Sequence, residues 1–149
     1  MQSCEGCRLV VDGGTDGCQS LFDELRGGQL VATTYQLQRL TVDTYCMQHP
    51  DRYCVSAKSL AAHLTGLCWT LEYSGHASGL KALQRWLDGR PRLEKPELPS
   101  FRGALTVADV SGAPDPAERA AAIGRWARST WDAYSALHRL ARRWVEEAL

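Results

Sequence analysis

The chain has 149 residues, the length of one ordinary domain that closes a single hydrophobic core. Its 17 basic and 17 acidic residues cancel, which excludes a global field that would draw it to nucleic acid or to an anionic membrane. We therefore expect a single domain over residues 1–149, and a charged partner such as nucleic acid would have to be bound by a local patch.

Residues 1–28 are expected to form a distinct N-terminal segment. Two cysteines and four glycines fall within its first 17 residues, with only a short apolar run at residues 9–11 between them. This pattern predicts a loop-rich knuckle with one short strand. From Cys18 onward the apolar residues follow a helical spacing, and Gly27 and Gly28 are expected to end that helix.

Three further helices are predicted between residues 33 and 89. The first covers residues 33–48, because Pro50 disfavours the helical conformation at His49. The second covers residues 56–72, whose leucines at i, i+4, i+7 and i+11 share one face. The third is shorter and is expected to end near Gly89.

A proline-rich loop is predicted over residues 90–114, since three prolines break every periodicity before residue 103. Within this loop, residues 105–110 resemble a short strand. Asp115 and Pro116 form a good N-cap and first-turn pair for one long final helix over residues 115–149. The expected fold is therefore mainly α, a small helical bundle with an N-terminal cysteine-containing metal-binding knuckle and at most short strands.

The chain contains six cysteines. Its N-terminus lacks the basic start and apolar run of a signal peptide, and no stretch approaches the roughly 20 apolar residues that span a bilayer. We therefore expect a cytoplasmic protein without a membrane segment. In that reducing compartment, grouped cysteines point to metal or redox chemistry more than to disulfides.

Cys4 and Cys7 have the C-x-x-C spacing that lets two thiolates reach one tetrahedral ion, and Gly6 helps the backbone turn between them. Cys18 adds a third thiol at a predicted helix N-terminus, where the helix dipole favours the thiolate. These three residues favour zinc, although thiolates also suit iron. Thioredoxin-like redox chemistry and plain unpaired cysteines are the alternatives, but the C-x-x-C is not followed by the helix that the redox motif needs.

A closed zinc site needs a fourth ligand, and no further cysteine or histidine lies in the N-terminal segment. His49 is the first choice, because it ends a helix beside a proline and its side chain is free to point towards another segment. Its alternative role is to cap helical carbonyls. His63 lies on the predicted buried face of its helix, either as a hydrogen-bonded core residue or as a ligand, and His138 has the same ambiguity. His76, in a Gly/Ser loop, is expected to be solvated.

Two features outside this set carry weaker signals. Asp43 is a candidate to orient a ligating imidazole or to accept a proton, although an exposed helix aspartate is the commoner case. Four arginines follow a helical spacing on the final helix and form a basic face that would suit nucleic acid, but such faces are usually solvated: Arg125, Arg128, Arg139 and Arg142.

Several strings together resemble an uncharacterised bacterial family of small proteins, a domain of unknown function. They are Cys-x-x-Cys, Gly17-Cys18, and Leu40-Thr-Val-Asp-Thr-Tyr45 followed by Gln48-His49-Pro50. The resemblance covers almost the whole chain and implies a common set of site residues: Cys4, Cys7, Cys18, Asp43, His49 and His63. It implies no activity. The chain departs from the pattern at Glu5 and Arg8, where similar proteins tend to carry Pro and Gly.

Two functional hypotheses follow. The first is a zinc-binding helical domain that acts as an interaction module for a protein or a small ligand, with the ion pinning the N-terminal segment onto the helices. The second is a metal-dependent enzyme in which three protein ligands leave an open coordination position, with Asp43 or a spare histidine as acid or base.

Overall fold

The computed structural model describes residues 1–29 and 33–149. A short antiparallel hairpin begins the chain: β1 (Gln2–Ser3) pairs with β2 (Val10–Val11), with Gln2 opposite Val11 and Ser3 opposite Val10. Helices make up the rest of the regular structure: α1 (Thr15–Gln29), α2 (Tyr35–Gln48), α3 (Pro50–Tyr53), α4 (Ala57–Glu72), α5 (Ala77–Asp88), α6 (Val107–Ser111), α7 (Pro116–Ala133), a 3₁₀ turn (Ser135–Leu137) and α8 (His138–Ala148).

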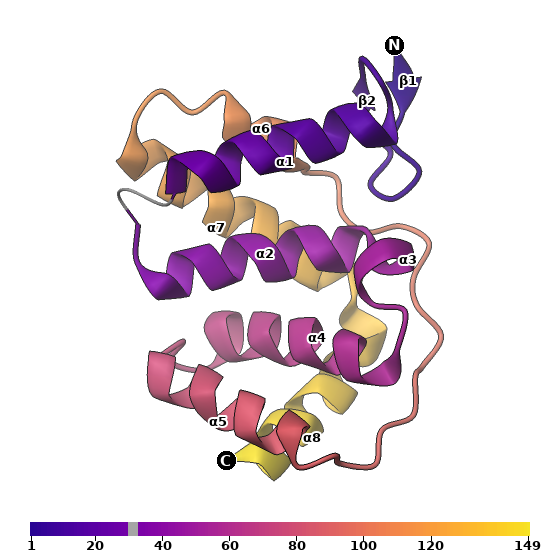
Figure 1. The fold of residues 1–149 in the computed structure, drawn as a ribbon, viewed down its shortest axis with the longest axis vertical. Helices are drawn as coiled ribbons and strands as arrows, with labels where there is room; N and C mark the ends of the chain where they lie inside the picture. The colour runs from indigo at the N-terminus through magenta and orange to yellow at the C-terminus, as the bar shows by residue number, and fades with distance from the viewer. Residues whose placement is uncertain (30–32) are drawn as a thin grey trace.

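The helices lie in two layers along the long axis of the molecule (Figure 1). Helices α1, α2, α4 and α5 follow one another down the front layer, and α6, α7 and α8 lie behind them. Contacts join α1 to α6, α2 to α7, and α4 to both α5 and α8. Residues between α5 and α6 return along one side of the molecule to the end that carries the hairpin.

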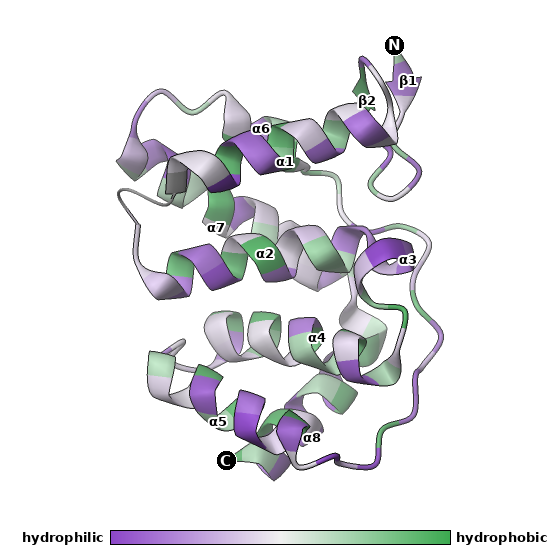
Figure 2. Cartoon of the chain, in the orientation of Figure 1, coloured by the Kyte–Doolittle hydropathy of each residue, from purple (hydrophilic) through white to green (hydrophobic). Residues whose placement is uncertain are grey.

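The apolar stripes read from the sequence form the core. On α4, Leu60, Leu64 and Leu67 are fully buried, whereas Leu71 is only partly buried. Helix α5 shows alternating hydrophobic and hydrophilic bands in Figure 2, because one side faces the core and the other faces solvent. The prediction of a mainly helical bundle is confirmed.

Side-chain caps start three of the helices, and one of these caps, Asp115, was predicted. Thr34 caps α2 by accepting from the backbone N–H of Leu37, and Ser56 caps α4 through a reciprocal capping box with Ser59. Asp115 caps α7 in the predicted way, accepting from the N–H of Glu118. Hydrogen bonds between residues close in the sequence therefore fix where these helices begin.

Several predicted element boundaries and one predicted strand are wrong. Gly27 and Gly28 do not end the first helix, since α1 continues to Gln29; a cost of about 1 kcal/mol per helical glycine does not stop a helix whose apolar face is buried. Residues 105–110 are not a strand, because Thr106 and Asp109 form a capping box that starts α6 inside the predicted loop over residues 90–114.

The long final helix predicted over residues 115–149 is divided in two. The chain leaves α7 at the fully buried Tyr134, makes a 3₁₀ turn and resumes as α8. The Tyr134 hydroxyl donates to the carbonyl of Met47 at the end of α2, which fixes the break against the core. The turn redirects the chain so that α8 packs on α4 and α5. No helix in residues 1–29 and 33–149 has both the length and the apolar character needed to cross a membrane.

Candidate metal centre

The turn of the hairpin presents Cys4 and Cys7. The backbone N–H of Cys4 donates to the carbonyl of Leu9 (2.7 Å), and the N–H of Arg8 donates to the carbonyl of Cys4 (2.9 Å). Arg8 adopts a left-handed conformation (φ 68°), which a glycine would take at least cost. These bonds close a tight loop, here called the knuckle (residues 4–9), in which Cys4 and Cys7 are both buried.

The knuckle packs directly on the end of α2. A side chain at Gly6 would overlap the imidazole of His49 and lie 2.9 Å from the carbonyl oxygen of Gln48. Arg102 donates from Nη1 to the carbonyl of Gly6 (3.0 Å), which ties the knuckle to the segment before α6. Gly6 therefore permits the close approach that brings the hairpin and α2 together.

Cys18 comes from the start of α1, which begins one turn earlier than predicted, at Thr15. Its backbone N–H donates to the carbonyl of Gly14 (2.9 Å). The thiol is fully buried and lies 3.7 Å, sulfur to sulfur, from Cys7. The positive end of the helix dipole favours a thiolate at this position.

His49 is the C-cap of α2, where the chain leaves the helix before Pro50. Its Nδ1 lies 2.7 Å from the carbonyl oxygen of Tyr45. A carbonyl only accepts, so Nδ1 carries the proton and Nε2 presents a lone pair. That atom lies 3.4 Å from Sγ of Cys4 and 3.5 Å from Sγ of Cys18.

Three separations within this group of four side chains are close to those that a tetrahedral ion imposes. Their ligand atoms all lie within 4.8 Å of one another, and all four residues are buried. Zn–S bonds of about 2.3 Å and Zn–N bonds of about 2.0–2.1 Å place tetrahedral ligands about 3.8 Å apart for S···S and about 3.6 Å for S···N. The observed separations of 3.7, 3.4 and 3.5 Å are close to those values. In the described part of the chain, no other group of three or more Cys, His, Asp or Glu residues is placed in this way.

The thiols are free rather than paired as disulfides, and the cluster already favours a thiolate. The pKa of Cys18 falls to about 4, first because Cys7 donates a hydrogen bond to it and then because of its contacts with His49 and with the Tyr45 hydroxyl, against the opposing effect of burial. The pKa of Cys7 is raised by the same hydrogen bond and by burial. Cys7 and Cys18 thus share a proton that a cation would displace.

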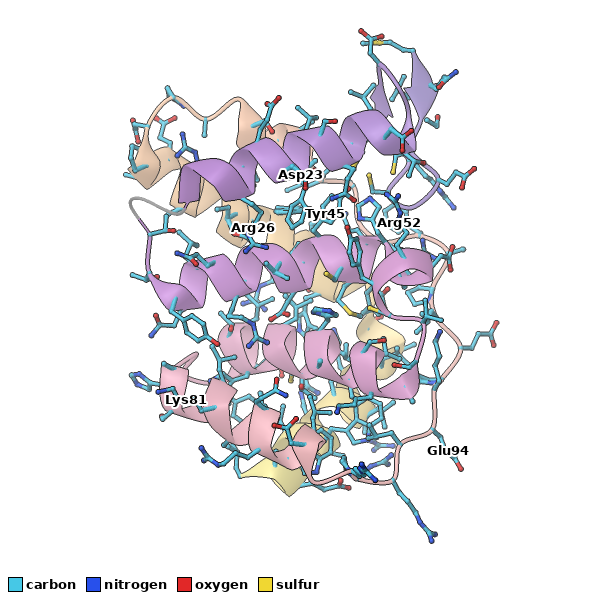
Figure 3. All side chains as sticks on the ribbon, viewed as in Figure 1. Asp23, Arg26, Tyr45, Arg52, Lys81 and Glu94 are labelled. Atoms are coloured by element: carbon cyan, nitrogen blue, oxygen red, sulfur yellow. The ribbon has the colours of Figure 1, made fainter. Side chains whose placement is uncertain are left out.

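Tyr45 supports two of the four side chains, a role that the sequence did not reveal. Its hydroxyl donates to Sγ of Cys18 (3.4 Å), and its carbonyl holds His49. Its ring stacks against Phe22 and against His49, each with a centroid separation of 3.9 Å. Figure 3 shows Tyr45 between α1 and α2, where it links both helices to the site. The signal available in the sequence was its i, i+4 spacing to His49.

The other candidate residues lie elsewhere. Asp43 does not orient His49, because that support comes from the Tyr45 carbonyl; it is hydrogen-bonded to His63 instead (2.9 Å), and neither joins the group of four. His138 stacks on Trp131 and bonds to its carbonyl. His76 is exposed, as expected, at the N-cap of α5.

Two of the arginines proposed as a basic face have structural partners. Arg128 donates to the carbonyl of Leu71 (3.3 Å), and Arg142 makes a two-point ion pair with Glu72. Because α7 and α8 are separate helices, the arginines do not form the single continuous stripe that the sequence suggested.

Comparison with known proteins gives a family but no activity. No curated protein and no solved structure matches the chain. One protein family does match, over residues 2–135, a span that includes the hairpin, all four clustered side chains, and the helices through α7. The chain therefore belongs to the family of unknown function DUF5946.

Proposed function

We propose that the protein is a zinc-binding helical domain, in which Cys4, Cys7, Cys18 and His49 hold one ion. The observation that carries this proposal is the tetrahedral spacing of their buried ligand atoms. Three thiolates and one imidazole are a common ligand set of structural zinc sites. The reducing conditions of the cytoplasm, where we place the protein, would keep these thiols available.

The ion would act structurally. Four protein donors leave no coordination position for water or substrate, so this arrangement favours a structural ion over the catalytic one of the alternative hypothesis. The ion would join the hairpin to the start of α1 and the end of α2. A two-stranded hairpin of this size has little stability of its own, so the metal–ligand bonds would supply what the small sheet lacks.

We propose further that the domain is an interaction module. Its support is an open hollow of about 890 Å³ between α7 and the segment before α6. Small residues line much of it, and the exposed ring of Phe101 borders it. Exposed aromatic rings beside small side chains suit the binding of a protein segment or a small ligand.

The metal claim is tested on protein purified under reducing conditions without added metal. Elemental analysis should find about one zinc per chain, and the cobalt-substituted protein should show the intense visible bands of tetrahedral thiolate coordination. An absence of both zinc and iron, together with failure to bind added cobalt, would refute the proposal. If the assay finds iron in place of zinc, the assignment of the site holds and only the identity of the ion changes.

The interaction claim has a separate test. Amide resonances of Gly103 and Gly124, which line the hollow, should shift when a fragment library is screened by nuclear magnetic resonance. Phe101→Ala should weaken those shifts, whereas Val55→Ala, at another exposed apolar residue, should not. A library that perturbs no residue of the hollow would contradict the module role and leave the metal centre unaffected.

A further inference from the structure

A second cluster of charged side chains lies where α2 packs on α4. Asp43, in the middle of α2, is 0% exposed. Its Oδ1 lies 2.9 Å from Nδ1 of His63 on α4, and its Oδ2 lies 3.6 Å from Nη2 of Arg39, one turn earlier on α2. A buried carboxylate is costly unless it is paired, so these two neighbours decide its state.

The packing makes room for this carboxylate at one glycine. A side chain at Gly66 would overlap Oδ2 of Asp43 and lie 3.2 Å from Nη2 of Arg39. Among the described residues, Oδ2 has no hydrogen-bond partner, since Arg39 is beyond that distance. The negative charge is therefore only partly compensated, and the carboxylate accepts its one hydrogen bond from Nδ1 of His63.

This geometry fixes the state of the imidazole. A carboxylate accepts, so Nδ1 of His63 carries a proton, and in the neutral imidazole Nε2 presents its lone pair. The His63 side chain is 21% exposed, and within the described residues no hydrogen bond to Nε2 occurs. A histidine oriented by a buried carboxylate, with its other nitrogen open, is the arrangement that enzymes use for a general base.

The pair is separate from the metal centre. His49 is oriented by the Tyr45 carbonyl, not by Asp43, and no third Cys, His, Asp or Glu among the described residues joins Asp43 and His63 as a metal ligand. The pair therefore does not form a metal site, and the open Nε2 of His63 is the atom available to accept a proton.

We propose that Asp43 and His63 form a second functional site, an acid–base pair at the surface between α2 and α4. It would take a proton from a small ligand that presents an ionisable O–H or N–H group to Nε2 of His63. Asp43 holds the ring and stabilises the imidazolium that forms. Arg39 weakens this stabilisation, because its positive charge partly compensates the carboxylate. The proposal does not depend on a bound metal.

The test uses diethyl pyrocarbonate, a reagent that reacts with the lone pair of Nε2. The nitrogen attacks a carbonyl carbon of the reagent, an N–C bond forms, and the C–O bond to the ethyl carbonate leaving group breaks. Ethyl carbonate leaves with the electron pair, takes a proton and decomposes to ethanol and carbon dioxide. The ring gives up its Nδ1 proton to Asp43 and then to solvent. Rates at each histidine are measured by mass spectrometry of peptides at neutral pH.

His76 is the internal standard, since it is exposed and makes no side-chain cap bond. His63 should react faster than His76 although it is less exposed. Asp43→Asn, which keeps the size but removes the charge, should slow His63 by at least about tenfold, within the contribution of an oriented acid–base group, and leave His76 unchanged. Asp88→Asn, at an exposed aspartate, is the matched control and should change neither rate.

Arg39→Gln gives a second comparison that does not disturb Asp43 itself. Removing the cation should speed the reaction of His63, because the carboxylate is then less compensated. Circular dichroism establishes that each variant is folded. In folded protein, a wild-type His63 that reacts more slowly than His76 would overturn the proposal. So would a His63 rate that neither Asp43→Asn nor Arg39→Gln alters, and the pair would then be a buried ion pair of the helix interface only.

Discussion

Nδ1 of His49 lies 2.7 Å from the carbonyl oxygen of Tyr45, one helical turn earlier, and this contact turns the opposite ring nitrogen towards Cys4 and Cys18. The final turn of α2 therefore sets the orientation of the only imidazole in the group of four. A metal-ligating histidine usually has its second nitrogen held in this way.

His49→Ala should lower zinc affinity by at least about tenfold, because the ion loses its only nitrogen donor and the hairpin loses its link to α2. Competition with a chromogenic chelator measures the affinity. His76→Ala is the control and should bind as the wild type does. Full affinity in His49→Ala would show that another residue completes the site.

Gly6→Ala should weaken metal binding without removing any donor. The added Cβ would overlap the His49 ring and press on the Gln48 carbonyl, so the knuckle must move away from α2. Gly27→Ala is the matched control: its Cβ would meet nothing within 4 Å, and alanine should stabilise α1 by up to about 1 kcal/mol. Chelator competition and thermal unfolding measure the two effects, and equal metal affinity in the two variants would contradict the proposed contact.

Tyr45→Phe should keep the metal but change the electronic state of one thiolate. The variant preserves the ring stacking on Phe22 and His49 and removes only the hydroxyl that donates to Cys18. In cobalt-substituted protein the thiolate-to-metal charge-transfer band should therefore shift, because the sulfur gains electron density. Tyr53→Phe, whose hydroxyl bonds to Gln19 instead, should leave the band in place. An unchanged band in Tyr45→Phe would show that its hydroxyl does not reach the metal-bound sulfur.

The Glu72–Arg142 pair should make stability depend on pH in the acid range. Hydrogen bonds from Arg142 hold the pKa of Glu72 below its usual value. A carboxyl whose folded-state pKa is lowered contributes stability above its unfolded pKa, and loses it as the pH falls through the folded value. Glu72→Gln should therefore be less stable than the wild type at neutral pH, with the difference closing in acid. Urea unfolding at several pH values measures this, and a difference independent of pH would contradict the ion pair's role.

The sequence predicted the parts of the fold and site that depend on local patterns. Cysteine spacing, the proline after His49 and the leucine periodicity of α4 each report a short-range constraint. These patterns were enough to select the four side chains that the structure brings together.

Features that depend on contacts between distant segments were missed. The break after α7 is fixed by Tyr134 bonding to Met47, 87 positions earlier, and Tyr45 reaches Cys18 across 27 positions. The pairing of Asp43 with His63 likewise depends on how α2 packs on α4 and on the absence of a side chain at Gly66. Residue spacing along one helix contains no information about such partners.

The metal content of protein purified under reducing conditions, without added metal, tests the central claim most directly. We predict about one zinc per chain in the wild type, and little in a Cys4→Ser, Cys7→Ser, Cys18→Ser triple variant, because all three thiolates are then lost. Wild-type protein without metal, or zinc that remains at full stoichiometry in the triple variant, would contradict the assignment of the ion to this site.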